Sequence, residues 1–444
     1  MKIVIAGAGE VGSHLAKLLS NEQQDIIVVD EDSERLARLD ANYNLLTVSG
    51  KATSFNTLRD ARAGKADLFI AVTPYESMNL VACSIAKSLG ARCTVARISH
   101  YSFMDPDNEP AMRRMGVDKL IYPEYLAARE IITALEHSWV RSWFELHDGQ
   151  IILVGVRIGD NAPLAGMQLK EFAATAGNFH VSAIRRNHET IIPRGDDRMM
   201  AGDVLYITTV RDNVPALIEL CGKKQRRIRR VLIMGASKIA IRLCDMASDR
   251  FKFTIIDSNR DTCRLLPEKC PQADIFHGDA RDTEVLTEAG IDDADAFVAL
   301  SPSSETNILT TLTAKELGAV KSVAEVEDIQ FISQAESLGI STVINKKLLA
   351  SSAIFQLLLD TDSSTSKCLA LADAEVAELE VRPGAKISSA PVKDLHLDRS
   401  MTLAGLIRDG QGMLITGNTV IQPGDRVLLF CLGGALRKVE RLFG

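Results

Sequence analysis

A glycine-rich turn near the start of the chain carries the clearest chemistry in the sequence. The residues Gly7-Ala8-Gly9-Glu10-Val11-Gly12 follow an apolar run and precede a helical pattern, and Asp30 ends the next apolar run. Strand, glycine turn, helix and a later acidic residue form the context that a dinucleotide-binding turn requires. Gly7 permits the tight turn, Gly9 lets a pyrophosphate approach the backbone, and Gly12 lets helix and strand pack closely. The first N–H groups of the helix then face the phosphates.

The acidic residue after the turn suggests which dinucleotide fits. Asp30 is placed to accept hydrogen bonds from an adenosine ribose. Glu31 and Asp32 follow it directly, and this negative charge would repel a 2′-phosphate. The sequence therefore predicts NAD(H) rather than NADP(H) as the cofactor. The alternative is a glycine turn that binds nothing.

The two halves of the chain repeat one another at a shift of 228 residues. Ala66–Ala91 overlays Ala294–Ala319 with 11 identities in 26 positions. A fainter similarity relates Ala201–Tyr206 to Pro423–Leu428, so the repeat extends into the segments that follow. The sequence thus predicts two larger units, 1–125 and 229–350, and two smaller ones, 140–222 and 368–444.

Two linkers support this division. Residues 223–230 carry six cations in eight positions, and residues 361–366 are polar and turn-rich. The basic run is read as a solvated linker, with a nucleic-acid patch as the alternative.

The second copy of the glycine turn is degraded. It reads Gly235-Ala236-Ser237-Lys238-Ile239-Ala240, with Asp257 after the next apolar run. Ser237 places a side chain where the pyrophosphate should approach, whereas Asp257 still suits a ribose and Lys238 could contact a phosphate. This copy therefore has two possible roles: it binds a nucleotide, or it is a structural scaffold that binds none.

Further candidate ligand contacts follow later strands of each repeat. Thr73-Pro74 and Ser301-Pro302 lie just past the fourth predicted strand, at the carboxyl edge where open α/β sheets bind ligands. Turn formation alone is the alternative for both pairs. Arg97 could reach a phosphate or the adenine face, but its repeat partner is Glu325. This charge reversal indicates that the two sites are not equivalent.

Strands alternate with helical patterns in each larger unit. In the first unit the strand-like runs are 3–6, 25–30, 45–48, 68–72 and 94–98. This order predicts a doubly wound, Rossmann-like parallel sheet of the α/β class. The smaller units mix strand-like runs with short helices, which predicts α+β modules. Each is expected to end in a helix, over 214–221 and 434–442.

Composition and charge exclude several classes of protein. Hydrophobic residues make up 46% of the chain and charged residues 25%, as in ordinary globular proteins. The net charge of −7 argues against nucleic acid as a partner. No run approaches the ~20 apolar residues that span a bilayer, so direct membrane insertion is not expected. The strand-like start leaves no room for a signal peptide, which favours a cytoplasmic location. The eight cysteines include no CxxC pair, so neither a metal site nor a disulfide framework is expected.

The sequence offers no recognisable catalytic pattern. The histidines and cysteines lack a partner motif, and neither a P-loop lysine signature nor a G-x-S-x-G turn occurs. A duplicated nucleotide domain with one degraded copy fits sensing better than turnover. An NAD-dependent oxidoreductase with the same fold is the alternative, and a scaffold that binds no nucleotide is a third hypothesis.

These motifs together resemble the RCK (KTN) family of regulatory domains. The residues that resemble its N-terminal half are Gly7–Gly12, Asp30, Ala71–Pro74, Asn79 and Arg97. Glu189–Asp196 with Ala201–Asp203 resembles its small C-terminal (TrkA-C) subdomain. The order of N-terminal half and C-terminal subdomain, each occurring twice, covers essentially the whole chain.

The resemblance implies a regulatory subunit of a Trk-type potassium uptake channel. Four chains would form a gating ring, peripheral on the cytoplasmic face of the plasma (inner) membrane, beneath a membrane-embedded potassium channel subunit. NAD(H), or ATP or ADP in some members, would change the shape of this ring. The resemblance also implies crossover and assembly helices over Tyr125–Trp143 and Leu348–Leu359. The first of these helices has apolar residues at helical spacing, which fit either an amphipathic contact face or an internal core face. They are Ile131, Ile132, Leu135, Trp139 and Trp143.

Overall fold

A computed structural model divides the chain into two compact units. The first unit holds residues 1–126 and 346–363, and the second holds 127–345 and 364–444. The structure describes residues 1–21, 24–146, 149–175, 178–187, 189–361, 368–371, 374–432 and 442–443. Most of the linker predicted at 361–366 and of the helix predicted over 434–442 therefore lies outside the described residues.

The first unit is built on a six-stranded parallel sheet. Its strands are β1 (Lys2–Ala6), β2 (Asp25–Asp30), β3 (Leu46–Ser49), β4 (Leu68–Ala71), β5 (Cys93–Arg97) and β6 (Lys119–Ile121). They lie in the order β3-β2-β1-β4-β5-β6, so the direction of winding reverses between β1 and β4. Open α/β sheets bind ligands outside the carboxyl ends of the strands at such a switch point.

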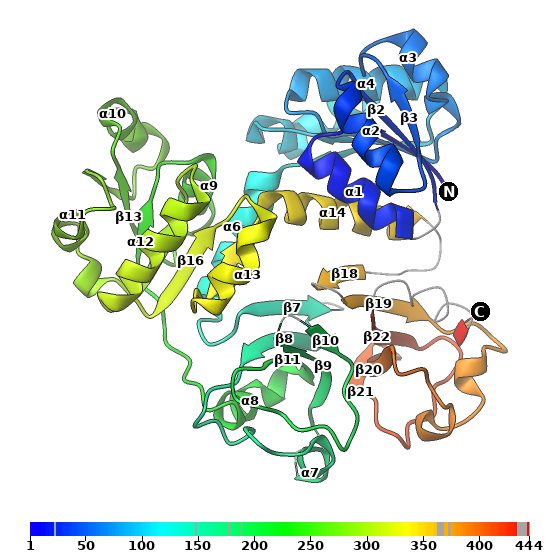
Figure 1. The fold of residues 1–444 in the computed structure, drawn as a ribbon, viewed down its shortest axis with the longest axis vertical. Coiled ribbons are helices and arrows are strands. Elements are labelled where there is room, and N and C mark those ends of the chain that lie inside the picture. Colours follow the sequence, from blue (N-terminus) through cyan, green and yellow to red (C-terminus); the bar gives the residue numbers. More distant parts are fainter. Residues whose placement is uncertain are drawn as a thin grey trace. The chain divides into compact units, whose positions relative to one another are not determined.

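Helices connect these strands (Figure 1). They are α1 (Glu10–Asn21), α2 (Ser33–Asn42), α3 (Phe55–Asp60), α4 (Glu76–Leu89) and α5 (Glu109–Arg114). Asp32 starts α2 by accepting hydrogen bonds from the N–H groups of Glu34 and Arg35 at 3.0 and 3.1 Å. All four residues of β4 are buried, as expected for a central strand covered on both faces.

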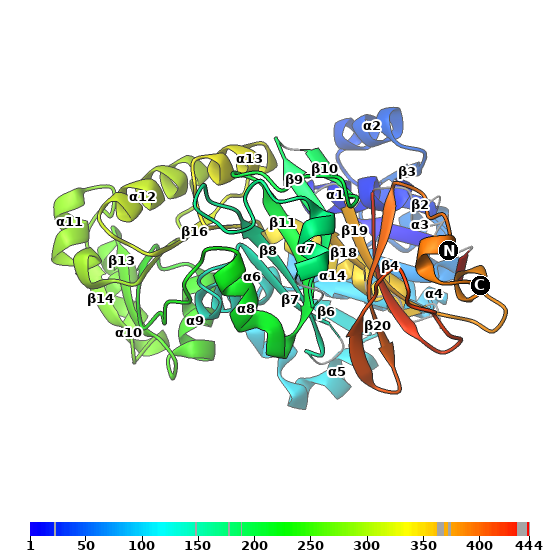
Figure 2. The ribbon, with the colours of Figure 1, turned by 90° about the horizontal axis from the view of Figure 1, so that it is seen from below.

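The second unit contains a sheet of the same topology. Its strands are β12 (Arg230–Met234), β13 (Lys252–Asp257), β14 (Asp274–His277), β15 (Ala296–Ala299), β16 (Lys321–Glu325) and β17 (Thr342–Ile344). Their order is β14-β13-β12-β15-β16-β17. The connecting helices are α9 (Lys238–Ala247), α10 (Arg260–Lys269), α11 (Thr283–Glu288), α12 (Ser304–Glu316) and α13 (Ile329–Ser337). Figure 2 shows α9 and α10 on one face of this sheet and α12 and α13 on the other. The predicted pair of Rossmann-like sheets is confirmed.

Each large sheet is followed in the chain by a small antiparallel sheet. The first contains β7 (Ser142–Leu146), β8 (Ile151–Arg157), β9 (His180–Arg186), β10 (Glu189–Ile191) and β11 (Val204–Val210), with helices α7 (Leu169–Thr175) and α8 (Val214–Leu220). The second contains β18 (Cys368–Leu371), β19 (Ala374–Glu380), β20 (Met401–Arg408), β21 (Gln411–Leu414) and β22 (Arg426–Leu432). The strand orders, β10-β9-β11-β8-β7 and β18-β19-β22-β20-β21, are related by the repeat.

The two small sheets share a hydrophobic core inside the second unit. Ile151 and Leu153 of β8 pack in one cluster with Leu428 and Phe430 of β22. Ile152, also on β8, lies in the first small domain's own core. The sheet is therefore covered on both faces, and its strands are apolar at consecutive positions.

The helices that follow the last strand of each large sheet are exchanged between the repeats. Helix α14 (Lys346–Thr361) follows the second sheet in the chain but belongs to the first unit, where it packs on α1 (Figure 1). Helix α6 (Pro123–Glu136) follows the first sheet, but from Ala127 onward it belongs to the second unit. Each large sheet is thus completed by a helix from the other repeat.

The helix predicted over Tyr125–Trp143 is confirmed as far as Glu136 and is wrong beyond it. Helix α6 ends at Glu136, and Trp143 lies on β7. Trp139 and Trp143 are buried in the core of the first small domain, while Ile131, Ile132 and Leu135 are buried positions on α6 itself. The spacing of the tryptophans happened to continue the helical period, although a different core buries them. The helix predicted over Leu348–Leu359 lies within α14. None of the helices that the structure describes is long and apolar enough to cross a bilayer.

Candidate nucleotide site

The predicted site residues of the first repeat lie along one edge of the first sheet. The glycine turn follows β1, Asp30 ends β2, Thr73 follows β4 and Arg97 ends β5. The strand register aligns these ends, because Ala6 pairs with Val29 on one side and with Ala71 on the other. The structure therefore brings them together at the carboxyl edge, around the point where the winding reverses.

The three glycines of the turn have three different surroundings. Gly7 has a φ of +114°, a left-handed conformation that suits glycine. A Cβ on Gly12 would lie 1.8 Å from the carbonyl oxygen of Gly7, so α1 approaches the turn too closely for any side chain. A Cβ on Gly9 would meet no protein atom within 4 Å. The space in front of Gly9 is open, as the approach of a pyrophosphate requires.

The start of α1 presents donors to this open space. The first N–H groups of a helix, here those of Glu10, Val11 and Gly12, have no acceptor within the helix. They carry the partial positive charge of the helix N-terminus, which favours phosphate. Ala8 and Val11 are buried and anchor the turn, while Glu10 is exposed.

Asp30 is held by the turn itself. Its Oδ2 accepts a hydrogen bond from the N–H of Ala8 at 2.6 Å, and its Oδ1 accepts one from the N–H of Asp32 at 2.8 Å. These two bonds fix the carboxylate beside the glycine turn. A carboxylate has about four acceptor positions, so both oxygens retain capacity for ribose hydroxyls.

Thr73 and Arg97 are connected through Asn79 of α4. The Thr73 hydroxyl donates to Asn79 Oδ1 at 2.7 Å, and Asn79 Nδ2 donates to the carbonyl of Arg97 at 2.8 Å. The Thr73 side chain is thereby engaged in holding the loop, while Pro74 is exposed and the Arg97 side chain is half-buried at the end of β5. This network positions the loop opposite the glycine turn.

Lys347 is a residue at this site that the sequence did not indicate. It lies in the first turn of α14, and its Nζ forms an ion pair with Glu10 in the glycine turn. Burial lowers the pKa of Lys347. A cation from the second repeat thus lies against the glycine turn of the first. The signal was hidden because more than 300 residues separate the partners and α14 is exchanged between the repeats.

The second turn keeps part of this geometry. Gly235 has a φ of +97°, and Asp257 accepts hydrogen bonds from the N–H groups of Ala236 and Asn259, both at 2.8 Å. Ser237 differs from Gly9, since its hydroxyl caps α9 by accepting a hydrogen bond from the N–H of Ala240 at 3.3 Å. One of the helix-start donors is therefore already bonded within the protein.

The remaining residues of the second site also differ in charge. Ser301 is held by Asn307 as Thr73 is by Asn79, with a hydroxyl-to-Oδ1 distance of 2.7 Å, and Pro302 is exposed. Lys238 is exposed and Ile239 is buried in α9. Glu325, buried at the end of β16, replaces the half-buried Arg97 of the first repeat. A buried carboxyl group at this edge disfavours a phosphate.

Comparison with known proteins identifies these domains. The TrkA-N domain family matches residues 3–123 and 231–346, and the TrkA-C domain family matches residues 153–222 and 376–444. The four matches follow the two large and the two small sheets.

Curated relatives match over the whole chain. The Trk system potassium uptake protein TrkA of Azorhizobium caulinodans is 28% identical over 451 residues, covering 100% of this chain and 98% of the relative. A Trk system potassium uptake protein TrkA homolog of Archaeoglobus fulgidus is 29% identical, with 100% of both chains covered. Among solved structures, the GsuK channel bound to NAD matches 100% of this chain and 78% of its own at 17% identity, with a TM-score of 0.60. The chain belongs to the family of proteins built from tandem TrkA-N and TrkA-C domains.

Proposed function

We propose that this chain is the nucleotide-binding regulatory subunit of a Trk-type potassium uptake system. The observation that carries the proposal is the complete phosphate-binding turn of the first repeat, with the open space at Gly9 and the anchored carboxylate of Asp30. Full-length relatives named for Trk potassium uptake support the process it serves. The subunit would act on the cytoplasmic face of the membrane, against a membrane-embedded potassium channel subunit.

The first turn is the proposed nucleotide site, and NAD(H) is its proposed ligand. Gly9 and the start of α1 would receive the pyrophosphate, and Asp30 would receive the ribose. The loop of Thr73 and Pro74, together with Arg97 at the end of β5, would contact the opposite side of the ligand. Asp30 stands beside two further carboxylates, which disfavours a 2′-phosphate. ATP and ADP share the adenosine and phosphate groups and are the competing ligands. The GsuK structure with NAD belongs to a protein of the same fold and supports the choice.

The second turn is proposed as a weaker site or a scaffold. Its helix start is capped by Ser237, and Glu325 replaces Arg97. As a scaffold, the turn would be maintained by the backbone conformation of Gly235 and by the hydrogen bond from the Ala236 N–H to Asp257.

Nucleotide occupancy would be transmitted through α14. A ligand shifts a conformational equilibrium only if it binds two states with different affinity. Lys347 contacts Glu10 at the turn, so bound phosphate would change the charge that α14 faces. The second repeat would therefore sense the ligand of the first.

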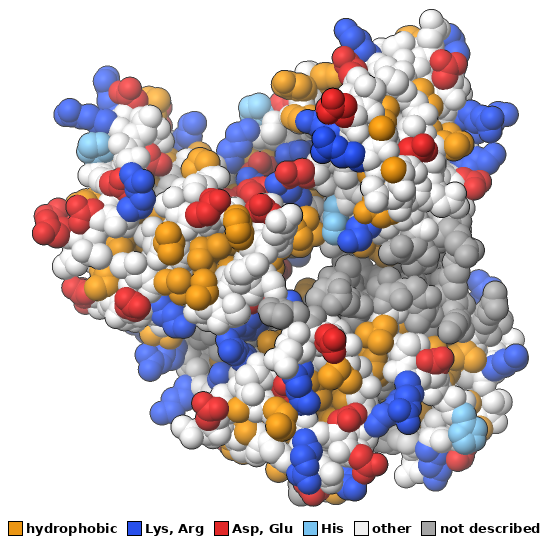
Figure 3. All heavy atoms as spheres, in the orientation of Figure 1, with side chains coloured by type: hydrophobic (Ala, Val, Ile, Leu, Met, Phe, Trp, Pro, Cys, Tyr) orange, Lys and Arg blue, Asp and Glu red, His pale blue; other side chains and the backbone are white. Residues whose placement is uncertain are grey.

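The proposed subunit would assemble into a homotetrameric ring. Exposed apolar side chains at equivalent positions of the two repeats support contacts between protein chains. Val81 on α4 is 47% exposed and Leu309 on α12 is 65% exposed, and the repeat relates these two positions. Figure 3 shows hydrophobic side chains gathered around α12 on the second large domain. Ile329 and Leu338, at the two ends of α13, are exposed as well. Apolar surface of this kind commonly marks a protein contact.

The decisive experiment is calorimetric titration of NADH, ATP and ADP into the wild type, Asp30→Ala and Asp257→Ala. We expect NADH binding to weaken by ~1–2 kcal/mol in Asp30→Ala, through lost charge-assisted hydrogen bonds. Asp257→Ala is the matched control and should leave the main binding event unchanged. Unchanged affinity in Asp30→Ala would contradict the assigned site.

Two further assays separate the regulatory role from its alternatives. Co-expression with the membrane subunit should restore potassium uptake in cells that lack their own regulator, and Gly9→Ala should impair it. Steady loss of NADH absorbance with a carbonyl substrate would instead support an oxidoreductase. Absence of binding by NADH, ATP and ADP would favour a scaffold.

A further inference from the structure

Two cysteines that are distant in the sequence line one cavity of the second large domain. Cys244 lies on α9, and Cys270 caps the end of α10, where its N–H donates to the carbonyl of Leu266 at 2.8 Å. Cys244 is 6% exposed and Cys270 1% exposed. They are separated by 25 residues, so their spacing resembles no CxxC motif.

Both cysteines line the same cavity, and each thiol shifts the pKa of the other. Their mutual interaction is the largest influence on both groups, and it raises the pKa of Cys244 and lowers the pKa of Cys270. Burial and Asp245 oppose ionisation of Cys270, whereas Arg242 and Lys269 favour it. Burial instead raises the pKa of Cys83 and the pKa of Cys93. It raises the pKa of Cys221 to about 12. A thiol with a lowered pKa beside a second thiol is the arrangement of a reactive pair.

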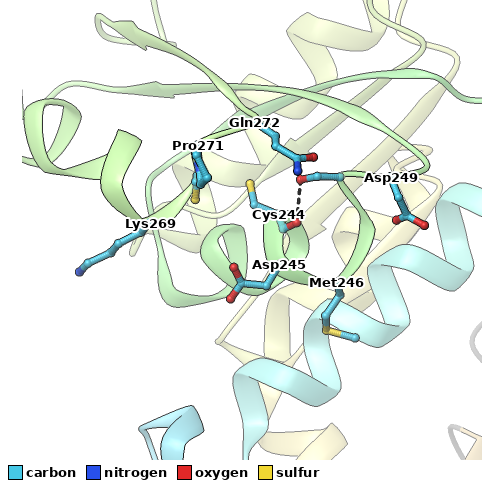
Figure 4. A pocket seen from close by; sticks show the side chains of 9 residues that line it. Cys244, Asp245, Met246, Asp249, Lys269, Pro271 and Gln272 are labelled. Atoms are coloured by element: carbon cyan, nitrogen blue, oxygen red, sulfur yellow. Dashed lines mark hydrogen bonds between the residues drawn. The ribbon is translucent and has the colours of Figure 1, made fainter.

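A cavity gives small molecules access to this pair. It has a volume of about 510 Å³ and is lined by both cysteines together with Asp245, Lys269 and Gln272. Figure 4 shows the sulfur of Cys244 directed toward the segment that carries Pro271, next along the chain after Cys270. The lining is largely polar, so hydrogen peroxide can be accommodated beside the sulfurs.

We propose that Cys244 and Cys270 form a dithiol site that hydrogen peroxide converts into an intramolecular disulfide. The Cys270 thiolate attacks one peroxide oxygen, the O–O bond breaks, and the departing hydroxide takes up a proton to become water. Cys270 is then a sulfenic acid. The Cys244 sulfur displaces its hydroxyl group, which leaves as a second water with the Cys244 proton, and the S–S bond forms. Each sulfur loses one electron and the peroxide gains two. A thiol reductant reverses the reaction by disulfide exchange.

The disulfide would join the two helices that frame the second glycine turn. Helix α9 starts at that turn, and α10 starts shortly after Asp257, which holds the turn's backbone. Oxidation would therefore stabilise this domain against unfolding, because the cross-link restricts the unfolded chain. The inference does not depend on nucleotide binding by either repeat.

The test is mass spectrometry of the full-length protein before and after peroxide, with free thiols alkylated under denaturing conditions. Oxidised wild type should take up two fewer alkyl groups, and digestion should release a linked peptide containing Cys244 and Cys270. Thermal unfolding of the oxidised protein should shift to higher temperature and return with dithiothreitol. Cys263→Ser, on α10 in the same domain, is the matched control and should still form the linked peptide.

Two variants identify the attacking sulfur. In Cys244→Ser, dimedone should trap a sulfenic acid at Cys270, and in Cys270→Ser the peroxide reaction of Cys244 should be much slower. If a variant does not fold, peptide mapping of the wild type decides alone. Retention of all free thiols in peroxide-treated, folded wild type would overturn the proposal, as would a linked peptide that joins other cysteines.

Discussion

Substitution of Gly9 by alanine separates nucleotide binding from folding. A Cβ at Gly9 meets no protein atom within 4 Å, so the folded chain accommodates the methyl group without rearrangement. Alanine is less favourable than glycine at the start of a helix, which lowers the stability of the folded chain. Alanine also reduces the conformational entropy of the unfolded chain, which raises the free energy of unfolding, so the two effects oppose each other. We therefore expect the free energy of unfolding to stay within about 1 kcal/mol of wild type.

The effect on the ligand should be much larger. The methyl group occupies the space through which the pyrophosphate would reach the N–H groups at the start of α1. Loss of one charge-assisted hydrogen bond costs about 1.5–3 kcal/mol, which corresponds to roughly 10- to 150-fold weaker binding. Calorimetry with NADH measures the affinity, and urea unfolding without ligand measures the stability.

Gly12→Ala is the contrasting variant. Its Cβ would lie 1.8 Å from the Gly7 carbonyl oxygen, so it should lower both stability and affinity. Wild-type NADH affinity in a folded Gly9→Ala protein would refute the reasoning, since the open space would then not be the phosphate site.

Three further predictions follow from particular contacts. Ser237→Gly removes the cap on α9 and opens the second turn, so calorimetry should detect added nucleotide binding there. Unchanged stoichiometry and affinity would show that the serine is not what keeps a nucleotide from the second turn. Lys347→Gln should weaken NADH binding severalfold while urea unfolding stays near wild type, and equal affinity would remove Lys347 from the site. Burial, with Arg141 also contributing and Glu130 opposing, lowers the pKa of Lys321 to about 7. The unfolded chain keeps this proton to about pH 10, so the free energy of unfolding should rise by up to about 1.4 kcal/mol per pH unit between pH 7 and 10. Lys321→Met should flatten that rise in urea unfolding at several pH values, and an unchanged slope would assign it to other groups.

The parallel sheets could be predicted because their strands carry a local signal. Each is a short apolar run bounded by a turn, and the repeat supplied a second reading of the same pattern. Boundaries differ by a residue or two, as for the strand expected at 45–48 and found as β3 (Leu46–Ser49).

The elements that cover the two faces of a small sheet could not be predicted from the sequence in the same way. Ile151, Ile152 and Leu153 are apolar in succession, which indicates burial on both faces but not what covers them. The second face is covered by β22, more than 270 residues later in the chain. Trp139 and Trp143 illustrate the same limit. Apolar residues at a regular spacing indicate that their side chains are buried, but they do not indicate which hydrophobic core buries them.

The two glycine turns share an aspartate with the same structural role but differ at the position of Gly9. Asp30 and Asp257 make the same pair of backbone hydrogen bonds, to Ala8 and Asp32 in one repeat and to Ala236 and Asn259 in the other. This structural task explains an aspartate at the end of the second strand whether or not a ribose is bound.

Gly9 has no such task, because its side-chain space touches no protein atom, and in the second repeat the same position carries a serine that caps the helix. We therefore expect the difference between glycine and serine at this position, rather than the shared aspartate, to decide which of the two turns binds a nucleotide. Loss of binding in Asp30→Ala must consequently be judged against the stability of that variant. Gly9→Ala and Ser237→Gly change the ligand's space directly, and opposite effects of these two substitutions on binding would establish that the first repeat holds the nucleotide.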